Sequence, residues 1–236
     1  MSDFAVFYVN WVADGSSGKA HRSRQSGAAL VGVIGWLKED PMADKAFEKF
    51  PKIAFKYSVS KPTQAKGQTV KGKTLEELRD ALDKVPFWGR YKGNENMSYK
   101  TNGKKQVTEV SVTAKPQIFM PVWSDYSKAS KEDQKAWDTM YAKLLKHENN
   151  HHNLALEVYA KLAKEVSDKS AEAEATNKAV EKEKDPKKKD KLIAAYTPWT
   201  TTTIKARMKT FFKDCKDVQQ TYDDKTHHGE KEGIVI

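Results

Sequence analysis

The sequence predicts an α+β protein, in which an antiparallel sheet packs against one long helix and a C-terminal helix. The long helix is predicted because residues 131–166 contain no Gly or Pro and repeat apolar side chains at steps of three and four. A second apolar stripe of the same period predicts the C-terminal helix over about residues 203–222. Between residues 53 and 122, alternating apolar residues and an Asn-Gly pair predict strands and a hairpin.

The composition excludes several classes of protein. A single cysteine, Cys215, rules out an internal disulfide framework and a zinc site made only of cysteines. The chain has 38% apolar and 31% charged residues, and its 6 Trp, 9 Tyr and 9 Phe can still fill a core. The longest apolar run, residues 28–37, is shorter than the roughly 18 residues that a bilayer span requires. We therefore expect no membrane span.

The first fifty residues offer no motif with an assignable function. Residues 4–12 predict a strand rich in valine and aromatic residues. Residues 28–37 predict a second, buried strand rather than a signal segment, because the run begins far from the first residue and contains Gly32 and Gly35. Without a clear signal peptide, the residues alone do not support export by the ordinary route.

Residues 53–123 predict the sheet and one short helix. Residues 53–59 alternate apolar and polar side chains, which indicates a half-buried strand. A loop containing Gly and Lys then leads to Thr74, whose hydroxyl forms a capping box with Glu77 at the start of a short Leu-rich helix. The apolar residues of this helix are expected to face the core.

A hairpin and a further strand follow this helix. Asn102-Gly103 predicts a type I′ turn between strands at residues 97–101 and 106–114. Residues 117–122 predict another strand, and Pro121 indicates that it ends or lies at an edge of the sheet. An edge strand just before the long helix could hold an extended peptide by strand addition.

The long helix begins at a capping pair, Ser130 and Asp133. Its opposite face carries lysines and asparagines. Its apolar stripe consists of Trp137, Met140, Leu144, His147, His151, Leu154, Val158 and Leu162. Two histidines therefore lie on the side of the helix that faces the core.

Residues 147–151 have the pattern His-Glu-x-x-His. Histidines four positions apart on a helix project from one face, so that both imidazoles can reach one metal ion. We expect this ion to be zinc, because zinc prefers imidazole ligands in tetrahedral geometry and a hydrolytic site keeps one position open for water. The carboxylate of Glu148 lies where it can hold that water and take its proton.

Two imidazoles leave a third protein ligand to be found. Glu157 is disfavoured because an unbroken helix turns it away from the histidine face, and His152 points about 100° off that face. Glu172 stays open as a ligand from a second helix, if the chain turns back before it.

The end of the chain offers another set of ligands. His227-His228-Gly229 follows the C-terminal helix, and Gly229 would let the backbone bend sharply beside the site. Asp223 or Asp224 could hold the second ring nitrogen of a ligand. Cys215, on the apolar stripe of this helix, is expected to be a core thiol.

These features together resemble a bacterial domain-of-unknown-function family of predicted secreted zinc-dependent proteases. The resemblance covers about residues 53–230. It rests on a Tyr-Ser-Val strand, a capped Leu-rich helix, an Asn-Gly hairpin, Met120-Pro121-Val122-Trp123, Trp137, the His-Glu-x-x-His-His run, and Tyr-Asp-x-x-Thr-x-His-Gly at residues 222–229.

The resemblance implies that His147, His151 and His228 bind zinc and that Glu148 is the general base. It also implies a secreted or periplasmic protein. Asn150 stands where the family commonly has Gly, which bears little on ligation. Tyr222 or His227 is a candidate donor to the oxyanion.

We therefore expect a zinc metallopeptidase that acts on a protein or peptide. Its domain would span residues 53–236, with a helical, charged insertion at 166–200, after an N-terminal extension of unknown role at 1–52. The alternative is a non-catalytic, metal-stabilised protein whose basic surface docks acidic partners or nucleic acid. Nucleic acid is the less favoured partner, because the net charge of +10 is spread along the chain and no basic motif is interleaved with aromatic residues.

Overall fold

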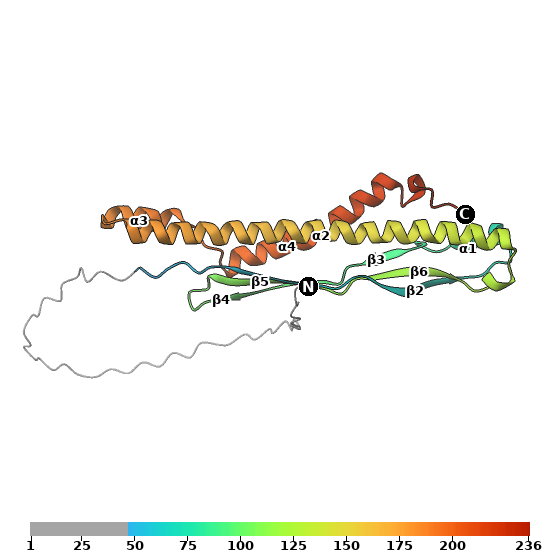
Figure 1. Cartoon of the computed structure of the whole chain (residues 1–236), viewed down its shortest axis with the longest axis horizontal. Helices are drawn as coiled ribbons and strands as arrows, with labels where there is room; N and C mark the ends of the chain where they lie inside the picture. Colours follow the sequence, from blue (N-terminus) through green and yellow to red (C-terminus); the bar gives the residue numbers. More distant parts are fainter. Residues whose placement is uncertain (1–46) are drawn as a thin grey trace, which may run out of the picture. The chain divides into compact units, whose positions relative to one another are not determined.

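The computed structural model describes residues 47–236, of which Phe50–Ile236 belong to one compact unit. The α+β class is confirmed, with two small sheets that lie along the same side of a long helix, α2 (Lys131–Lys182) (Figure 1). The strands predicted at residues 4–12 and 28–37 lie outside the described residues. No helix among residues 47–236 is long and apolar enough to cross a membrane.

The strands form two three-stranded sheets rather than one antiparallel sheet. The first has the order β1 (Ala54–Val59), β5 (Val107–Ala114), β4 (Glu95–Thr101). The second has the order β2 (Thr63–Val70), β6 (Gln117–Trp123), β3 (Arg90–Lys92). In each sheet the central strand, β5 or β6, pairs in parallel with one neighbour and antiparallel with the other.

Three connections join the two sheets: β1 to β2, β3 to β4 and β5 to β6. All three cross from one sheet to the other at the same level. Pro62 and Pro116 interrupt two of the segments because they lack an N–H, and Asn94 interrupts the third with a φ of 51°. The N–H of Thr63 donates to the Pro116 carbonyl at 3.1 Å, and Asn94 Nδ2 donates to the Lys115 carbonyl at 2.9 Å. One three-stranded ribbon is thus divided into two sheets.

Strand β6 is central, so the prediction that Pro121 marks an edge strand is wrong. The register of β2 shifts between Lys66 and Thr69, where two residues of β2 face the single residue Pro121. This β-bulge accommodates the missing N–H of proline. β3 is an edge strand, because it pairs only with β6 in this sheet, and it lies next to α2.

Two strands, β2 and β3, were not predicted from the sequence. β2 was expected to be a loop because its sequence, TQAKGQTV, is polar, and its pairing with β6 depends on a partner more than fifty residues later. β3 has three residues, too few for a periodic pattern. The hairpin of β4 and β5 is confirmed, but its turn is not type I′. Asn102 Oδ1 accepts from the N–H groups of Lys104 and Gln106, and the positive φ belongs to Lys105.

The helix starts and the apolar stripe of α2 are confirmed. Thr74 caps α1 (Leu75–Leu82) by accepting from the Glu77 N–H, and Ser130 caps α2 by accepting from the Asp133 N–H. The stripe of α2 is buried, apart from half-buried Leu154. In α2, the capping residue and the buried stripe are thus those that the sequence predicts.

Helix α2 continues without a break to Lys182, so the first part of the helical, charged segment expected at 166–200 belongs to the same long helix. Ser170 Oγ accepts from the Ile53 N–H at 3.1 Å, and Asn177 bonds to both main-chain groups of Phe50. A short helix, α3 (Pro186–Ala195), then leads to α4 (Thr201–Thr226). On α4, Cys215 is a buried thiol as predicted, whereas Phe212 is exposed.

Helix α2 joins two hydrophobic cores. The first lies between the β1-β5-β4 sheet, α4 and the α2 residues from Ala155 onward. The second lies between the β2-β6-β3 sheet, α1 and the α2 residues up to Leu144. The His-Glu-x-x-His segment therefore occupies the stretch of α2 between the two cores.

Candidate functional site

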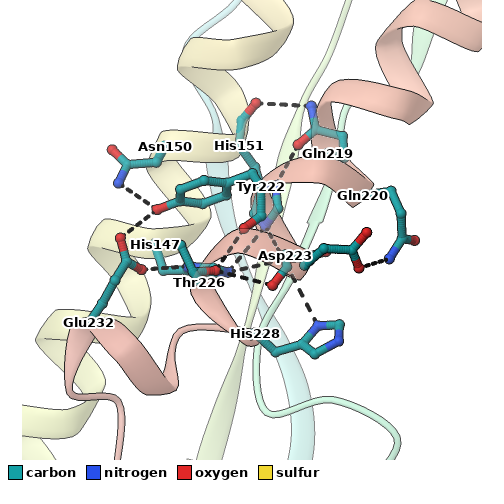
Figure 2. A network of polar contacts seen from close by, with 11 residues as sticks. His147, Asn150, His151, Gln219, Gln220, Tyr222, Asp223, Thr226, His228 and Glu232 are labelled. Carbon is teal, nitrogen blue, oxygen red and sulfur yellow. Dashed lines mark hydrogen bonds and ion pairs between the residues drawn. The ribbon is translucent and has the colours of Figure 1, made fainter.

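Three ligand atoms meet between α2 and the end of α4. His147 Nε2 lies 3.2 Å from His151 Nε2, and Asp223 Oδ1 lies 3.3 Å and 3.0 Å from these two nitrogens (Figure 2). His147 and His151 come from successive turns of α2, and Asp223 comes from the last turn of α4. Together they form a group of side chains that could hold a metal ion.

The outer ring nitrogens of both histidines have acceptors. His147 Nδ1 lies 2.7 Å from Glu232 Oε2, and His151 Nδ1 contacts Gln219 Oε1. The amide orientation of Gln219 is set by its Nε2, which donates to the His151 carbonyl at 3.1 Å. Neutral histidines in this arrangement carry their proton on Nδ1 and direct the lone pair of Nε2 towards the centre.

In that tautomer, three atoms that can each coordinate a metal ion face one another at the centre. Burial lowers the pKa of His151, against the opposing effect of the nearby Asp223 carboxylate, so the neutral imidazole prevails at neutral pH. A cation bound between the two Nε2 atoms and the Asp223 oxygen, which lie 3.0–3.3 Å apart, would interact favourably with all three. These separations match the edges of a tetrahedron around a zinc-sized ion, about 3.4 Å for bonds of about 2.0–2.1 Å.

Glu148 lies beside this group and is buried, with 4% of its surface exposed. Its Oε2 is a buried polar atom with no hydrogen-bond partner. Burial and, to a smaller extent, the negative charge of Asp223 together raise the pKa of Glu148 to about 8, although a hydrogen bond from the Tyr91 N–H acts in the opposite direction. A cation at the triad would favour the charged carboxylate.

The Glu148 carboxylate has room only because residue 89 is glycine. A Cβ at Gly89 would lie 2.6 Å from Glu148 Oε1 and 2.9 Å from Leu144 Cδ1. The backbone just before β3 therefore forms one wall of the Glu148 site.

The triad and Glu148 open into a cleft with a volume of about 970 Å³. The loop between α1 and β3 forms one side of this cleft, and the segment after α4 forms the other, including His227, His228 and residues 234–236. A cleft of this size is large enough for a small ligand or part of a peptide.

The structure places Asp223, expected to support a ligand, at the third corner of the group, and His228 outside it. His228 is 77% exposed, with its Nδ1 4.0 Å from Asp223 Oδ1. His227 and His228 both have left-handed backbone angles, with φ of 50° and 51°, and their side chains face solvent. Ligation by His228 would require its side chain to move inward.

The other candidates for a third ligand lie away from the group. Because α2 is unbroken, Glu172 is about 30 Å along the axis from His151, and it pairs with Lys169. Glu157 is exposed. His152 Nδ1 is 3.4 Å from the Tyr91 hydroxyl, on the neighbouring face of the helix.

Tyr222 supports the site from outside the triad. Its hydroxyl donates to Glu232 Oε1 at 2.7 Å and accepts from Asn150 Nδ2 at 2.8 Å (Figure 2). Its ring stacks on His147 with centroids 4.8 Å apart. Burial would raise the pKa of Glu232, but hydrogen bonds from Tyr222 and His147 outweigh it and lower this pKa, which keeps Glu232 charged.

Sequence reasoning missed Glu232 and Gln219. Gln219 lies one helical turn before Asp223, and this spacing on the predicted C-terminal helix was a usable signal. Glu232 lies in the short helical turn η2 (Glu230–Glu232), where no periodic pattern points to it.

A family model described as a bacterial protein of unknown function, DUF922, matches residues 66–190, which is more than half of the chain. The chain belongs to the DUF922 family. The part matched to DUF922 includes His147, Glu148 and His151 and ends before α4, so Asp223 and Glu232 lie beyond it. Among curated proteins and among solved structures, no match was found.

Proposed function

We propose that this DUF922 protein is a zinc-dependent metallopeptidase. In this proposal His147, His151 and Asp223 hold the ion, and Glu148 is the general base. The observation that carries it is the convergence of three potential ligand atoms, 3.0–3.3 Å apart, beside a buried carboxylate oxygen without a hydrogen-bond partner. Two imidazoles and one carboxylate are a known ligand set of catalytic zinc, with a fourth position left open.

Zinc, when bound, supplies a Lewis acid that polarises a carbonyl and acidifies water. Glu148 is placed to accept a proton from that water at Oε2 and to return it to the leaving amine. The main-chain N–H of Tyr91 and the absence of a side chain at Gly89 hold the carboxylate in place. Burial keeps bulk water away from the carboxylate, which strengthens its interaction with nearby charges.

Glu232 and Gln219 act through the ligands. Each accepts from the Nδ1 of one histidine and so fixes its tautomer and ring orientation. Tyr222, predicted as an oxyanion donor, instead holds Glu232, because its hydroxyl hydrogen is already donated there.

An extended peptide is the substrate that best fits the surroundings. β3 is an edge strand and lies against α2 at the cleft, whereas β6, the strand first considered for this role, has neighbours on both sides. Peptide addition along β3 would bring a main-chain carbonyl past Glu148.

Metal analysis and a cleavage assay test the proposal. Purified protein should contain about one zinc per chain, and it should cleave members of a broad peptide library. Glu148→Gln should keep the metal and lose cleavage, while Glu157→Gln, an exposed position on the same helix, should behave like the wild type. Zinc retained by a wild type that cleaves nothing would favour the alternative, a metal-stabilised binding protein with a basic surface.

A further inference from the structure

Exposed apolar side chains gather at the mouth of the cleft. Within residues 47–236, three large apolar side chains are exposed: Phe87 at 41%, Phe212 at 40% and Val235 at 63%. Phe87 and Val235 line the cleft, and Phe212 does not. Single exposed apolar residues are common, but two that converge on one cleft indicate a surface that a ligand covers.

Both side chains belong to chain segments that contact Glu148 or a triad residue. Phe87 is two residues before Gly89, whose Cβ position is 2.6 Å from Glu148 Oε1. Val235 is three residues after Glu232, which contacts His147 at 2.7 Å. Since consecutive Cα atoms are 3.8 Å apart, the Cα of Phe87 is within about 8 Å of that of Gly89, and Val235 is within about 11 Å of Glu232.

The apolar surface is already formed without a ligand. The Arg90 guanidinium lies over the Phe87 ring at 5.2 Å and over the Phe119 ring at 5.5 Å, which holds Phe87 in place. Trp88 packs against the core of the second sheet. On the other side of the cleft, the burial of Ile234 in that same core anchors the chain next to Val235.

We propose that Phe87, Trp88 and Val235 form a subsite for a bulky apolar side chain of a peptide, next to the bond presented to Glu148. This inference rests on the proposed peptidase function and specifies its substrate. The cleft then combines these apolar side chains with the polar groups of the triad and Glu148, so that one ligand could contact both. Because neighbouring side chains of an extended peptide point in opposite directions, one of them can enter this subsite while the backbone follows β3.

Matched peptides test the subsite in catalysis. Peptides that differ only in Phe, Leu, Ala or Asp next to the scissile bond should be cleaved with kcat/KM about 10-fold or more higher for Phe and Leu than for Ala. Phe87→Ser and Val235→Ser should each reduce this preference several-fold, by lowering kcat/KM for the Phe and Leu peptides. Phe212→Ser, equally exposed but outside the cleft, should leave the preference unchanged. An unchanged Phe-to-Ala ratio in both cleft variants would overturn the subsite.

A binding measurement separates this inference from the proposed function. Zinc-loaded Glu148→Gln should bind a fluorescent Phe peptide about 10-fold more tightly than its Ala counterpart, and adding Phe87→Ser should remove the difference. Tight, Phe-dependent binding by a protein that cleaves nothing would defeat the peptidase proposal and support the subsite. Cleavage without any apolar preference would support the peptidase proposal and overturn the subsite. Binding of phosphatidylcholine vesicles but of no apolar peptide would overturn the subsite as a peptide site.

Discussion

Glu232 Oε2 lies 2.7 Å from Nδ1 of His147, although the two residues are 85 positions apart in the chain. A short turn after the last long helix thus orients a candidate metal ligand on α2. The same carboxylate accepts from the Tyr222 hydroxyl, so both of its oxygens are used. The C-terminal segment is therefore part of the site.

Removing this support should weaken metal binding without abolishing it. We expect Glu232→Ala to lower zinc affinity by about 10- to 100-fold, because His147 loses the acceptor that fixes its tautomer. Competition with a chromophoric chelator measures the change. Glu230→Ala, an exposed position in the same turn, is the control. Equal affinities for both variants would show that the contact does not support the ligand.

The third ligand can be identified by a pair of substitutions. Asp223→Ala should abolish stoichiometric zinc binding, because it removes one of three converging atoms. His228→Ala should retain the metal, because its side chain is exposed and outside the triad. Asp224→Ala controls for charge, since this exposed neighbour bonds to Gln220. Loss of zinc in His228→Ala but not in Asp223→Ala would reinstate the ligand implied by the family resemblance.

Adding one carbon at Gly89 should disturb the general base. The Cβ of Gly89→Ala would meet Glu148 Oε1 at 2.6 Å, so the carboxylate must move. We expect kcat/KM for peptide cleavage to fall by about 100-fold with the zinc content unchanged, since small misplacements of a catalytic group have effects of this order. Gly103→Ala is the matched control, because nothing lies within 4 Å of the added atom there. Equal activity of the two variants would argue against the proposed position of Glu148.

Glu148 should make the metal-free protein less stable as the pH rises. Its pKa is raised to about 8 in the folded state, above the usual value of 4.5, so between these pH values the folded chain holds a proton that the unfolded chain has released. The free energy of unfolding therefore falls as the pH increases from about 5 to 8. Glu148→Gln lacks this titration and should gain stability over the wild type across that range, on the order of 4 kcal/mol at pH 8.

Urea denaturation in the presence of EDTA, at pH 5 and at pH 8, measures this difference. The free energies of unfolding of the variant and the wild type should be nearly equal at pH 5 and should differ at pH 8. A stability difference that is the same at both pH values would contradict the raised pKa.

The helices could be predicted because their signals are local. The Ser130 and Thr74 caps each involve residues three positions apart, and the stripe of α2 repeats within single turns. The far half of α2 was harder to predict, because small residues such as Ser170 and Ala173 carry no strong apolar signal, although both are buried and Ser170 bonds to the main chain of Ile53. Strands β2 and β3 were missed because their partner β6 is distant in the chain and their own residues are polar or few.

By itself, the sequence determined that two imidazoles share one face of a capped, amphipathic helix and that a carboxylate lies one residue's rotation from it, since these positions depend only on the helical repeat. Only the tertiary structure decided which other side chains contact these three groups. The angle at which α4 returns along α2 brings in Asp223 rather than His228, and the left-handed turn after α4 places Glu232 behind His147. These contacts join segments that are 68 to 85 positions apart, so their geometry follows from the packing of α4 and the C-terminal segment against α2.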